Sequence, residues 1–579
     1  MLLLQTQPIS EQPVNQPGGN YTTDYQPFTF SPAMILLGVA FVGFFAAVAI
    51  AQSMSGGTGK KNIIGAARWA MPKDKNMARR TGLNQIKNQK HDEVTLWINA
   101  PNKIDGEKIN GDARTIYLPD MARGTAVIGG SGSGKSFSVI RPTLRAAIAQ
   151  GLPSILLDTD YPGLTKTIAP LAESVGYDVH IFAPGYPESR VCNVLDFVKD
   201  CRDGTGASQI AKTLNKNFAM GNSKNEDLFF KVSGELATEA ALLLAKALKH
   251  KDILTAFTIL KDEDMIDRVR GVGQIDPWLE LAFGQLMSTA KSEKTVDSIR
   301  GTAALLFGQL MRPDILPALI GETTMPLEVT GKNLLIFGVK QDIRLVVSPL
   351  IASIIHAIVT SNVKPGRQEP LFLSLDEMPS MYFPEISEWL AEKRKYGLCT
   401  LLGYQSLGQL KKTYGPELAD VIYTNTATKF FFNPQSIESA KIFSETLGEN
   451  DIVYKTKSRT YGKSRTLNEH RTKKRLFSPE EFMSLDAGSC VLISPGYGTR
   501  NQRFVPVKLD PIKITKKELD IESASKGLWN EFLTRAIRKG VSDKRIATDE
   551  IDRRSEDFKS RLPIVDTKAG QLDNLLSEL

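Results

Sequence analysis

The feature that most constrains the fold of this 579-residue chain is a glycine-rich octapeptide directly after a short apolar run. Thr125-Ala-Val-Ile128 has the β-prone character of a buried strand, and GGSGSGKS (residues 129–136) fits the pattern G-x-x-x-x-G-K-[ST] in full. Glycines let backbone N–H groups curl around a phosphate without Cβ clashes, and a following helix adds partial positive charge. The pattern therefore predicts a strand, a phosphate-binding loop and a helix within an α/β fold.

Each residue type in this loop has a chemical role. We expect Lys135 to reach the β- and γ-phosphates of ATP and the Ser136 hydroxyl to ligate Mg²⁺. A plain glycine- and serine-rich turn would not need Lys-Ser at the start of a helix, so we favour the nucleotide site. The predicted nucleotide-binding residues are Gly129, Gly130, Ser131, Gly132, Ser133, Gly134, Lys135 and Ser136.

A second strand supplies the acidic residues that such a loop requires. Leu371-Phe-Leu-Ser-Leu375 is apolar and is followed by Asp376 and Glu377. We expect Asp376 to hold Mg²⁺ through water, and Glu377 to orient or deprotonate the attacking water. The glutamate favours hydrolysis over mere nucleotide binding.

Further apolar runs alternate with helical stretches, which is typical of a parallel α/β sheet. Polar residues at the carboxyl ends of such strands face the ligand crevice. Gln405 ends one such strand, so it is a candidate γ-phosphate sensor, with a surface or turn glutamine as the alternative. The additional predicted strands are 154–157, 177–182, 333–337 and 400–404.

Hydrophobicity and charge indicate a membrane anchor near the N-terminus. Residues 33–51 carry no charge. As a helix they would be about 28 Å long, which is close to the roughly 30 Å thickness of the hydrocarbon core of a membrane. Residues 1–30 contain no Lys or Arg, unlike a cleaved signal peptide, whereas residues 60–80 are rich in both. This predicts a single-pass protein of the cytoplasmic (inner) membrane, with its N-terminus outside.

Net charge is only +8, and the four cysteines form no C-x-x-C pair, which excludes a thiolate zinc site.

With these motifs in place, the chain resembles the type IV secretion coupling proteins of the TraG/TraD kind, relatives of the FtsK/HerA DNA translocases. The resemblance runs from about residue 60 to 508. It rests on GAARWA (65–70), GGSGSGKS, LFLSLDEMPS (371–380), GYQSLGQLKKTYG (403–415) and RLFSPEEFMSLDAG (475–488). One block departs from the family: Asp158 keeps the aspartate of D-P-K-G-[DE], but the lysine is missing. Family members also commonly have two membrane helices, where this chain shows one.

The resemblance implies a RecA-like P-loop NTPase sheet with an inserted all-α domain. It also implies a ring-forming homo-hexamer whose ATP hydrolysis drives DNA transfer through a type IV secretion, or conjugation, channel. Implied partners are sequence-independent, single-stranded DNA, a relaxase, channel subunits and membrane lipids. Arg394 has the spacing of an arginine that stabilises γ-phosphate charge from a neighbouring subunit; a solvated basic helix face is the alternative.

The expected organisation combines the motifs with changes in composition. We expect a short exterior tail (1–30), a transmembrane helix (31–53), a membrane-proximal segment (54–110), a nucleotide-binding domain (111–195 and 325–510), an inserted all-α domain (196–324) and a charged C-terminal tail (511–579). Residues 455–475 hold nine basic residues and a single acid, and their Ser, Thr, Gly and Asn predict a loop. That loop could bind phosphates in a pore or lipid head groups, or be a solvated surface.

Three other functions are compatible with the same residues. A coupling ATPase could carry protein effectors, a docking receptor could use nucleotide only for assembly, and a DNA pump of the FtsK/HerA kind could work outside secretion. Steady ATP turnover that depends on Glu377 would exclude pure docking.

Overall fold

A computed structural model describes residues 67–564 of the chain, apart from 102, 106–107, 221–227, 272–275, 290–291, 460–464, 499–504, 542–545 and 548. The expected exterior tail and membrane helix lie outside the described residues. Within those residues, one helix, Gln341–Asn362, is long and apolar enough to cross a membrane, but 72% of its most apolar window is buried inside the protein. This helix is therefore part of the core of the fold.

A nine-stranded sheet forms the centre of the protein, in the order β15-β14-β11-β5-β10-β9-β6-β8-β7. The seven strands from β11 to β7 are parallel, and β14 and β15 are antiparallel additions at one edge. All six strands expected from the sequence are present, so the mixed α/β fold with a large parallel sheet is confirmed. The strands are β5 (Thr125–Ile128), β6 (Ser154–Asp158), β7 (Asp178–Phe182), β8 (Asn333–Gly338), β9 (Leu371–Leu375), β10 (Leu398–Tyr404), β11 (Thr428–Phe431), β14 (Cys490–Ile493) and β15 (Val507–Leu509).

Both faces of this sheet are buried, which explains why its strands read as continuous apolar runs. Along β5, Ala126 and Ile128 join the hydrophobic core on one face, and Val127 joins the core on the other. The helices around the sheet and its margins are α2 (Pro72–Asn88), α3 (Arg141–Ala149), α4 (Thr165–Ser174), α12 (Arg344–Asn362), α13 (Ile386–Ala391), α14 (Leu407–Tyr414), α15 (Pro416–Asn425), α16 (Ile437–Leu447) and α17 (Pro479–Met483). Two small antiparallel pairs lie outside this sheet: β1 (Leu96–Ile98) with β4 (Ile116–Leu118), and β2 (Lys103–Asp105) with β3 (Lys108–Asn110).

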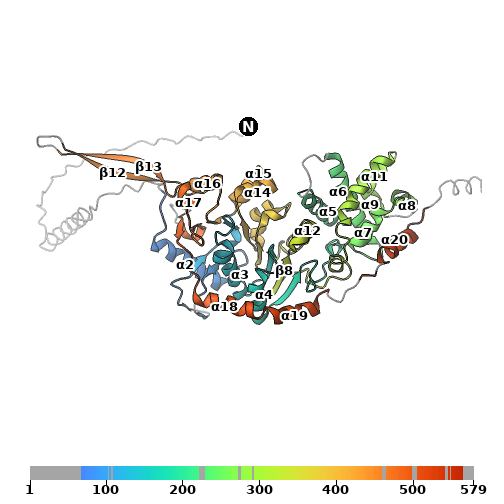
Figure 1. Cartoon of the computed structure of the whole chain (residues 1–579), viewed down its shortest axis with the longest axis horizontal. Helices are drawn as coiled ribbons and strands as arrows, with labels where there is room; N and C mark the ends of the chain where they lie inside the picture. The colour runs from blue at the N-terminus through green and yellow to red at the C-terminus, as the bar shows by residue number, and fades with distance from the viewer. Residues whose placement is uncertain are drawn as a thin grey trace, which may run out of the picture. The chain divides into compact units, whose positions relative to one another are not determined.

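The chain between β7 and β8 is helical wherever it forms regular structure within the described residues. Figure 1 shows these helices gathered together, with α20 from the C-terminal part beside them. Helix α5 packs on α12, which joins the group to the sheet. The helices are α5 (Gly204–Ala219), α6 (Leu228–Ala247), α7 (Ile253–Lys261), α8 (Met265–Gly271), α9 (Pro277–Ala282), α10 (Gly284–Thr289) and α11 (Glu293–Gly308).

The C-terminal part forms three helices: α18 (Lys516–Gly527), α19 (Trp529–Lys539) and α20 (Glu550–Arg561). Helices α18 and α19 pack on α4, beside the sheet, whereas α20 packs on α7 in the helical group. We refer to residues 516–561 as the strap, because its two ends contact different parts of the chain.

The expected loop at 455–475 is wrong: the segment forms a two-stranded antiparallel ribbon, β12 (Glu449–Arg459) and β13 (Arg465–Arg475). Eleven residue pairs keep one register along it, and Figure 1 shows the two strands side by side. The polar and charged composition favoured a loop, but the segment also contains Thr and Tyr, and β12 begins before it with Ile452 and Val453; these residue types favour strands. Cross-strand hydrogen bonding between these two successive strands decided in favour of the ribbon.

Candidate functional site

The glycine-rich loop lies where β5 ends, and neighbouring segments hold it on both sides. Gly129 N–H donates to the Tyr404 carbonyl at the end of β10 (3.2 Å), and Gly130 N–H donates to the Asn433 carbonyl (2.8 Å). The backbone at Gly134 has φ +95°, and a Cβ there would lie 2.7 Å from the Gly488 nitrogen. Glycine is thus required by both conformation and space.

The chain leaves the loop through a single turn of π-helix, Ser136–Ile140, and continues into α3. Lys135 stands at the start of this turn and is largely buried. Its Nζ donates to the carbonyls of Gly129 (2.5 Å) and Gly130 (3.1 Å). Burial lowers the pKa of Lys135, and the Glu377 and Asp376 carboxylates oppose that change. The lysine charge therefore lies between the loop and the acidic pair.

The acidic pair follows β9 at the same edge of the sheet. Ser136 Oγ donates to Asp376 Oδ2 at 3.4 Å, which joins the loop to the acidic strand end. Burial, with the Asp158 and Glu377 carboxylates nearby, raises the pKa of Asp376 to about 6. Burial destabilises the ionised form of Asp376. A bound cation would stabilise that form and lower the pKa again, so the carboxylate is suited to hold one.

Glu377 occupies the left-handed region of backbone conformation, with φ +57°. Such a conformation is strained for a residue other than glycine and is found disproportionately at functional sites. Glu377 Oε1 accepts a hydrogen bond from Gln409 Nε2, and Gln409 Oε1 accepts one from the Gln405 N–H (3.1 Å). Gln405 itself is exposed at this edge.

Gln409 is a residue that the sequence reasoning missed. It lies in the first turn of α14, and its side chain connects Glu377 to the backbone of Gln405. The signal was present, because Gln405 and Gln409 are both glutamines of the Q-S-x-x-Q-L run, four residues apart. Residues at this spacing across a strand end and helix start can face one site.

Asp158 ends β6 beside the same site, but its side chain already has partners. Its Oδ2 accepts hydrogen bonds from Leu164 N–H (3.1 Å), Thr165 N–H (2.8 Å) and Thr165 Oγ1 (2.7 Å). Asp158 therefore holds the start of α4. Within the described residues, no group of three or more His, Cys, Asp or Glu side chains is arranged to hold a metal ion. A Mg²⁺ bound here would rely on Ser136, Asp376 and nucleotide oxygens.

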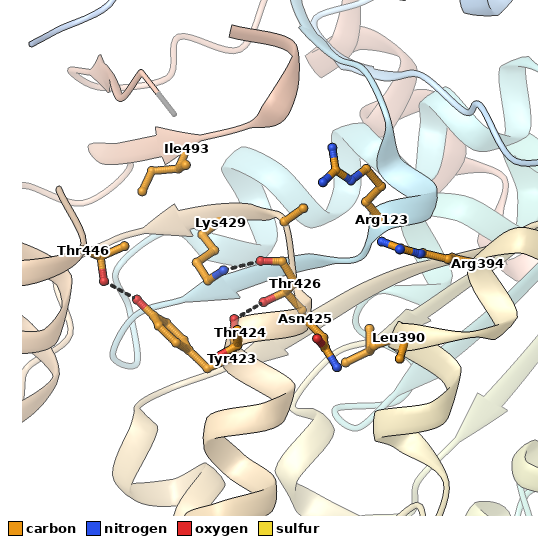
Figure 2. A pocket seen from close by; sticks show the side chains of 12 residues that line it. Arg123, Leu390, Arg394, Tyr423, Thr424, Asn425, Thr426, Lys429, Thr446 and Ile493 are labelled. Atoms are coloured by element: carbon orange, nitrogen blue, oxygen red, sulfur yellow. Dashed lines mark hydrogen bonds between the residues drawn. The ribbon is translucent and has the colours of Figure 1, made fainter. Parts of the chain in front are cut away.

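Arg394 lies elsewhere, in the segment that leads into β10. It lines a cavity with a volume of about 440 Å³ at the amino ends of β5, β10 and β11 (Figure 2). The phosphate-binding loop is at the carboxyl end of β5, and strands as long as β10 extend about 20 Å. Within one chain, Arg394 and the loop are therefore on opposite edges of the sheet.

Two further cations share this cavity with Arg394. Arg123 precedes β5 and is exposed, and Figure 2 shows its side chain near that of Arg394. Lys429, on β11, is buried; its Nζ donates to the Thr426 carbonyl and lies 4.8 Å from the Tyr423 ring centroid. Burial lowers the pKa of Lys429 to about 8. The sequence analysis singled out Arg394 alone, because the other two lie far from it along the chain.

The loop, the acidic strand end and the parallel sheet define the class of a P-loop protein. The family described as "Type IV secretion-system coupling protein DNA-binding domain" matches residues 118–499, about two thirds of the chain, and the chain belongs to this family. The resemblance to coupling proteins of the TraG/TraD kind is thereby confirmed.

Individual relatives agree with this assignment. The coupling protein TraD of Escherichia coli (strain K12) is 25% identical over 363 residues, which are 58% of this chain and 49% of that protein. The chain thus matches about half the length of that relative. Among solved structures, the plasmid coupling protein TrwB is similar in its complex with the non-hydrolysable GTP analogue GDPNP (TM-score 0.53, 15% identity, 80% of this chain and 97% of that chain). TrwB in complex with ADP and Mg²⁺ gives a TM-score of 0.53 at 16% identity, over the same shares.

Proposed function

We propose that this chain is a membrane-anchored ATPase coupling protein that recruits a DNA–relaxase substrate and uses ATP hydrolysis to drive DNA transfer through a type IV secretion channel. The observation that supports this proposal most is that three groups lie together at the carboxyl ends of the strands. They are the glycine-rich loop, the acidic pair Asp376 and Glu377, and the glutamines Gln405 and Gln409. Family membership and the similarity to coupling proteins support the cargo and the channel.

The residues at this edge fit ATP and Mg²⁺. Backbone N–H groups of residues 129–136 would hold the phosphates, and Lys135 Nζ would exchange its two carbonyl partners for phosphate oxygens. Ser136 and Asp376 would hold Mg²⁺, which supplies neutralisation of phosphate charge when bound. The raised pKa of Asp376 supports this fit, because the nearby Lys135 charge does not offset burial and the neighbouring carboxylates.

Glu377 is the proposed base. Gln409 donates to one carboxylate oxygen, which orients the side chain and leaves the other oxygen to accept a proton from water. Gln405 is the proposed γ-phosphate sensor at the same edge. We assign Arg394 to the nucleotide of a neighbouring subunit, because its own loop is on the opposite edge of the sheet; Arg123 and Lys429 lie beside it in the same cavity.

The proposed organisation follows the motifs. Residues 111–195 and 325–510 form the RecA-like nucleotide-binding domain, residues 196–324 the inserted all-α domain, and residues 31–53 a single membrane helix with the N-terminus outside. In a homo-hexamer, each cavity around Arg394 would face the loop of the next subunit. Single-stranded DNA, a relaxase and channel subunits are the proposed partners.

The test of this function is the Glu377→Gln variant of the full chain. The amide keeps the size of the side chain and the bond from Gln409 but cannot accept the proton, so ATP turnover should fall by about a hundredfold or more. ATP binding should remain. Turnover is measured with and without single-stranded DNA, and the exposed Glu392→Gln variant is the matched control.

The same assay distinguishes the rival functions. Unchanged turnover in Glu377→Gln would remove the catalytic assignment. Turnover that never responds to DNA would favour a protein cargo, and DNA transfer that survives in Glu377→Gln would favour a docking receptor. Translocation along double-stranded DNA without a relaxase would favour a DNA pump outside secretion.

A further inference from the structure

The β12–β13 ribbon has two chemically different faces. Consecutive residues of a strand lie on opposite faces, so the register divides the ribbon into two sets. One set, which we call the basic face, contains seven basic residues and three acids. The basic residues are Lys455, Lys457, Arg459, Arg465, Arg471, Lys473 and Arg475, and the acids are Glu449, Asp451 and Glu469. The other set, the polar face, contains one lysine, Lys474, among Asn, Ile, Tyr, Thr, Ser and His. Such a division concentrates positive charge on one surface.

The positive charge is balanced near the base of the ribbon and unbalanced farther out. Glu449 is paired with Arg475, and Asp451 with Lys473, at the end nearest the body. Farther along, Lys455 is paired with Glu469, whereas at the far end Arg459 is paired directly with Arg465. Like charges at paired positions destabilise a ribbon, and a bound polyanion removes that cost. The far part of the basic face is therefore suited to an anionic surface.

The base of the ribbon lies against the chain that arrives from the N-terminal side. Ala67 N–H donates to the Glu449 carbonyl at 3.0 Å. Two residues later, the Trp69 ring packs edge-on to Phe477, just beyond the ribbon, with 5.7 Å between centroids. The first described residues of the chain are thus attached to the start of β12 and the end of β13.

This attachment limits how far the ribbon can lie from the apolar segment 33–51. Residues 52–66, fifteen in number, connect the two and are rich in Gly and Ser. Fully extended, fifteen residues span at most about 54 Å. Eleven paired residues make the ribbon itself about 35 Å long. The length of the connection therefore sets an upper limit on the distance between the base of the ribbon and the membrane helix of the proposed function.

We propose that the basic face of the β12–β13 ribbon binds anionic phospholipid head groups of the membrane in which the chain is anchored. This inference rests on the membrane anchor of the proposed function. Each lysine or arginine near an anionic surface strengthens binding by about fivefold. A second contact at the ribbon would fix the orientation of the ATPase relative to the membrane.

The test uses the full chain reconstituted in phosphatidylcholine vesicles, with and without phosphatidylglycerol. Chymotrypsin cleaves after aromatic residues, so cuts at Tyr454 and Tyr461 report access to the ribbon through the fragment masses. We expect cleavage there to be slower by about tenfold or more on the anionic vesicles. High salt should remove most of the protection, because it screens the charges.

Two variants with the same change in net charge distinguish the contributions of the two faces to this protection. The basic-face variant is Lys457→Gln, Arg459→Gln and Arg465→Gln; the polar-face control is Thr456→Glu, Ser458→Glu and Thr466→Glu. Protection should be lost in the first variant and kept in the second.

Three results would overturn the proposal: equal cleavage on both kinds of vesicle, equal loss in both variants, or protection by single-stranded DNA on neutral vesicles without protection by anionic lipid. The last result would assign the ribbon to nucleic acid. Flotation with neutral vesicles and ATP turnover are measured on the same samples, so failure of the anchor or of the ATPase is recognised separately.

Discussion

At the scale of single residues, Asp376 shows how a buried carboxylate weakens the fold that holds it. Burial and the neighbouring Asp158 and Glu377 carboxylates raise its pKa from an ordinary value of 3.8 to about 6. The folded protein therefore favours the protonated form. The associated stability is fully present below about pH 4 and is lost as the pH rises through about 6.

This leads to a prediction for the Asp376→Asn variant without nucleotide or Mg²⁺. The amide removes the cost of the buried charge, so at about pH 8 the variant should be more stable than the parent protein by about 2 kcal/mol. At about pH 4 the difference should nearly vanish. Thermal unfolding at both pH values measures the difference in stability. ATP turnover of the variant should be lost. An equal gain at both pH values would point to a cause other than ionisation.

Gln409 and Glu377 illustrate what a motif conveys and what it omits. The acid and the glutamine run were both visible in the sequence, but their contact depends on β9 and β10 being neighbours in the sheet. That pairing brings residues 32 positions apart within hydrogen-bonding distance.

At the scale of elements, the strap is attached to the nucleotide site through buried ion pairs. Arg145 of α3, the helix that continues from the phosphate-binding loop, pairs with Glu518 of α18 (2.5 Å), and both side chains are at most 6% exposed. At the other end, Arg554 of α20 pairs with Asp252 at 3.1 Å, at the start of α7. The strap therefore connects the loop helix to the helical group between β7 and β8.

We predict that Glu518→Ala destabilises the protein by about 2 kcal/mol, because it leaves the buried Arg145 with Glu522 alone. The exposed pair Lys90–Glu93 supplies the control: Glu93→Ala should leave stability close to that of the parent. Denaturant unfolding measures both. Replacing Arg145 with Met and Glu518 with Leu together should recover part of the loss, since the buried Arg145–Glu518 pair is then absent. Glu522 keeps Arg141 and Lys526 as partners. No recovery would mean that packing, not charge, dominates.

At the scale of the whole molecule, the sheet separates two sets of cations. Lys135 lies at the carboxyl edge, and Arg394, Arg123 and Lys429 lie at the amino edge. One copy cannot bring the two sets to one phosphate, so the proposed role of Arg394 requires a second copy.

A mixing experiment tests this arrangement. Arg394→Ala and Lys135→Ala should each lower ATP turnover of assembled protein by about a hundredfold or more. Mixed assemblies should regain turnover, because some interfaces combine an intact loop with an intact arginine. If Arg394 acts within its own subunit, the mixture will show only the sum of the two residual activities. The control is Lys395→Ala, which should behave like the parent protein. In the parent, the Lys395 ammonium lies 4.9 Å from the Tyr396 ring centroid.

The sequence by itself determined the glycine-rich loop, the acidic strand end and six of the seven strands of the parallel part of the sheet. These features are local: glycine conformations, a Lys-Ser pair and apolar runs depend on consecutive residues. Only the tertiary structure decided that residues 455–475 pair as a ribbon, that Gln409 contacts Glu377, and that the charged C-terminal segment grips both α4 and α7. Each of these depends on contacts between separate elements, whose free energy adds to and can outweigh local propensity.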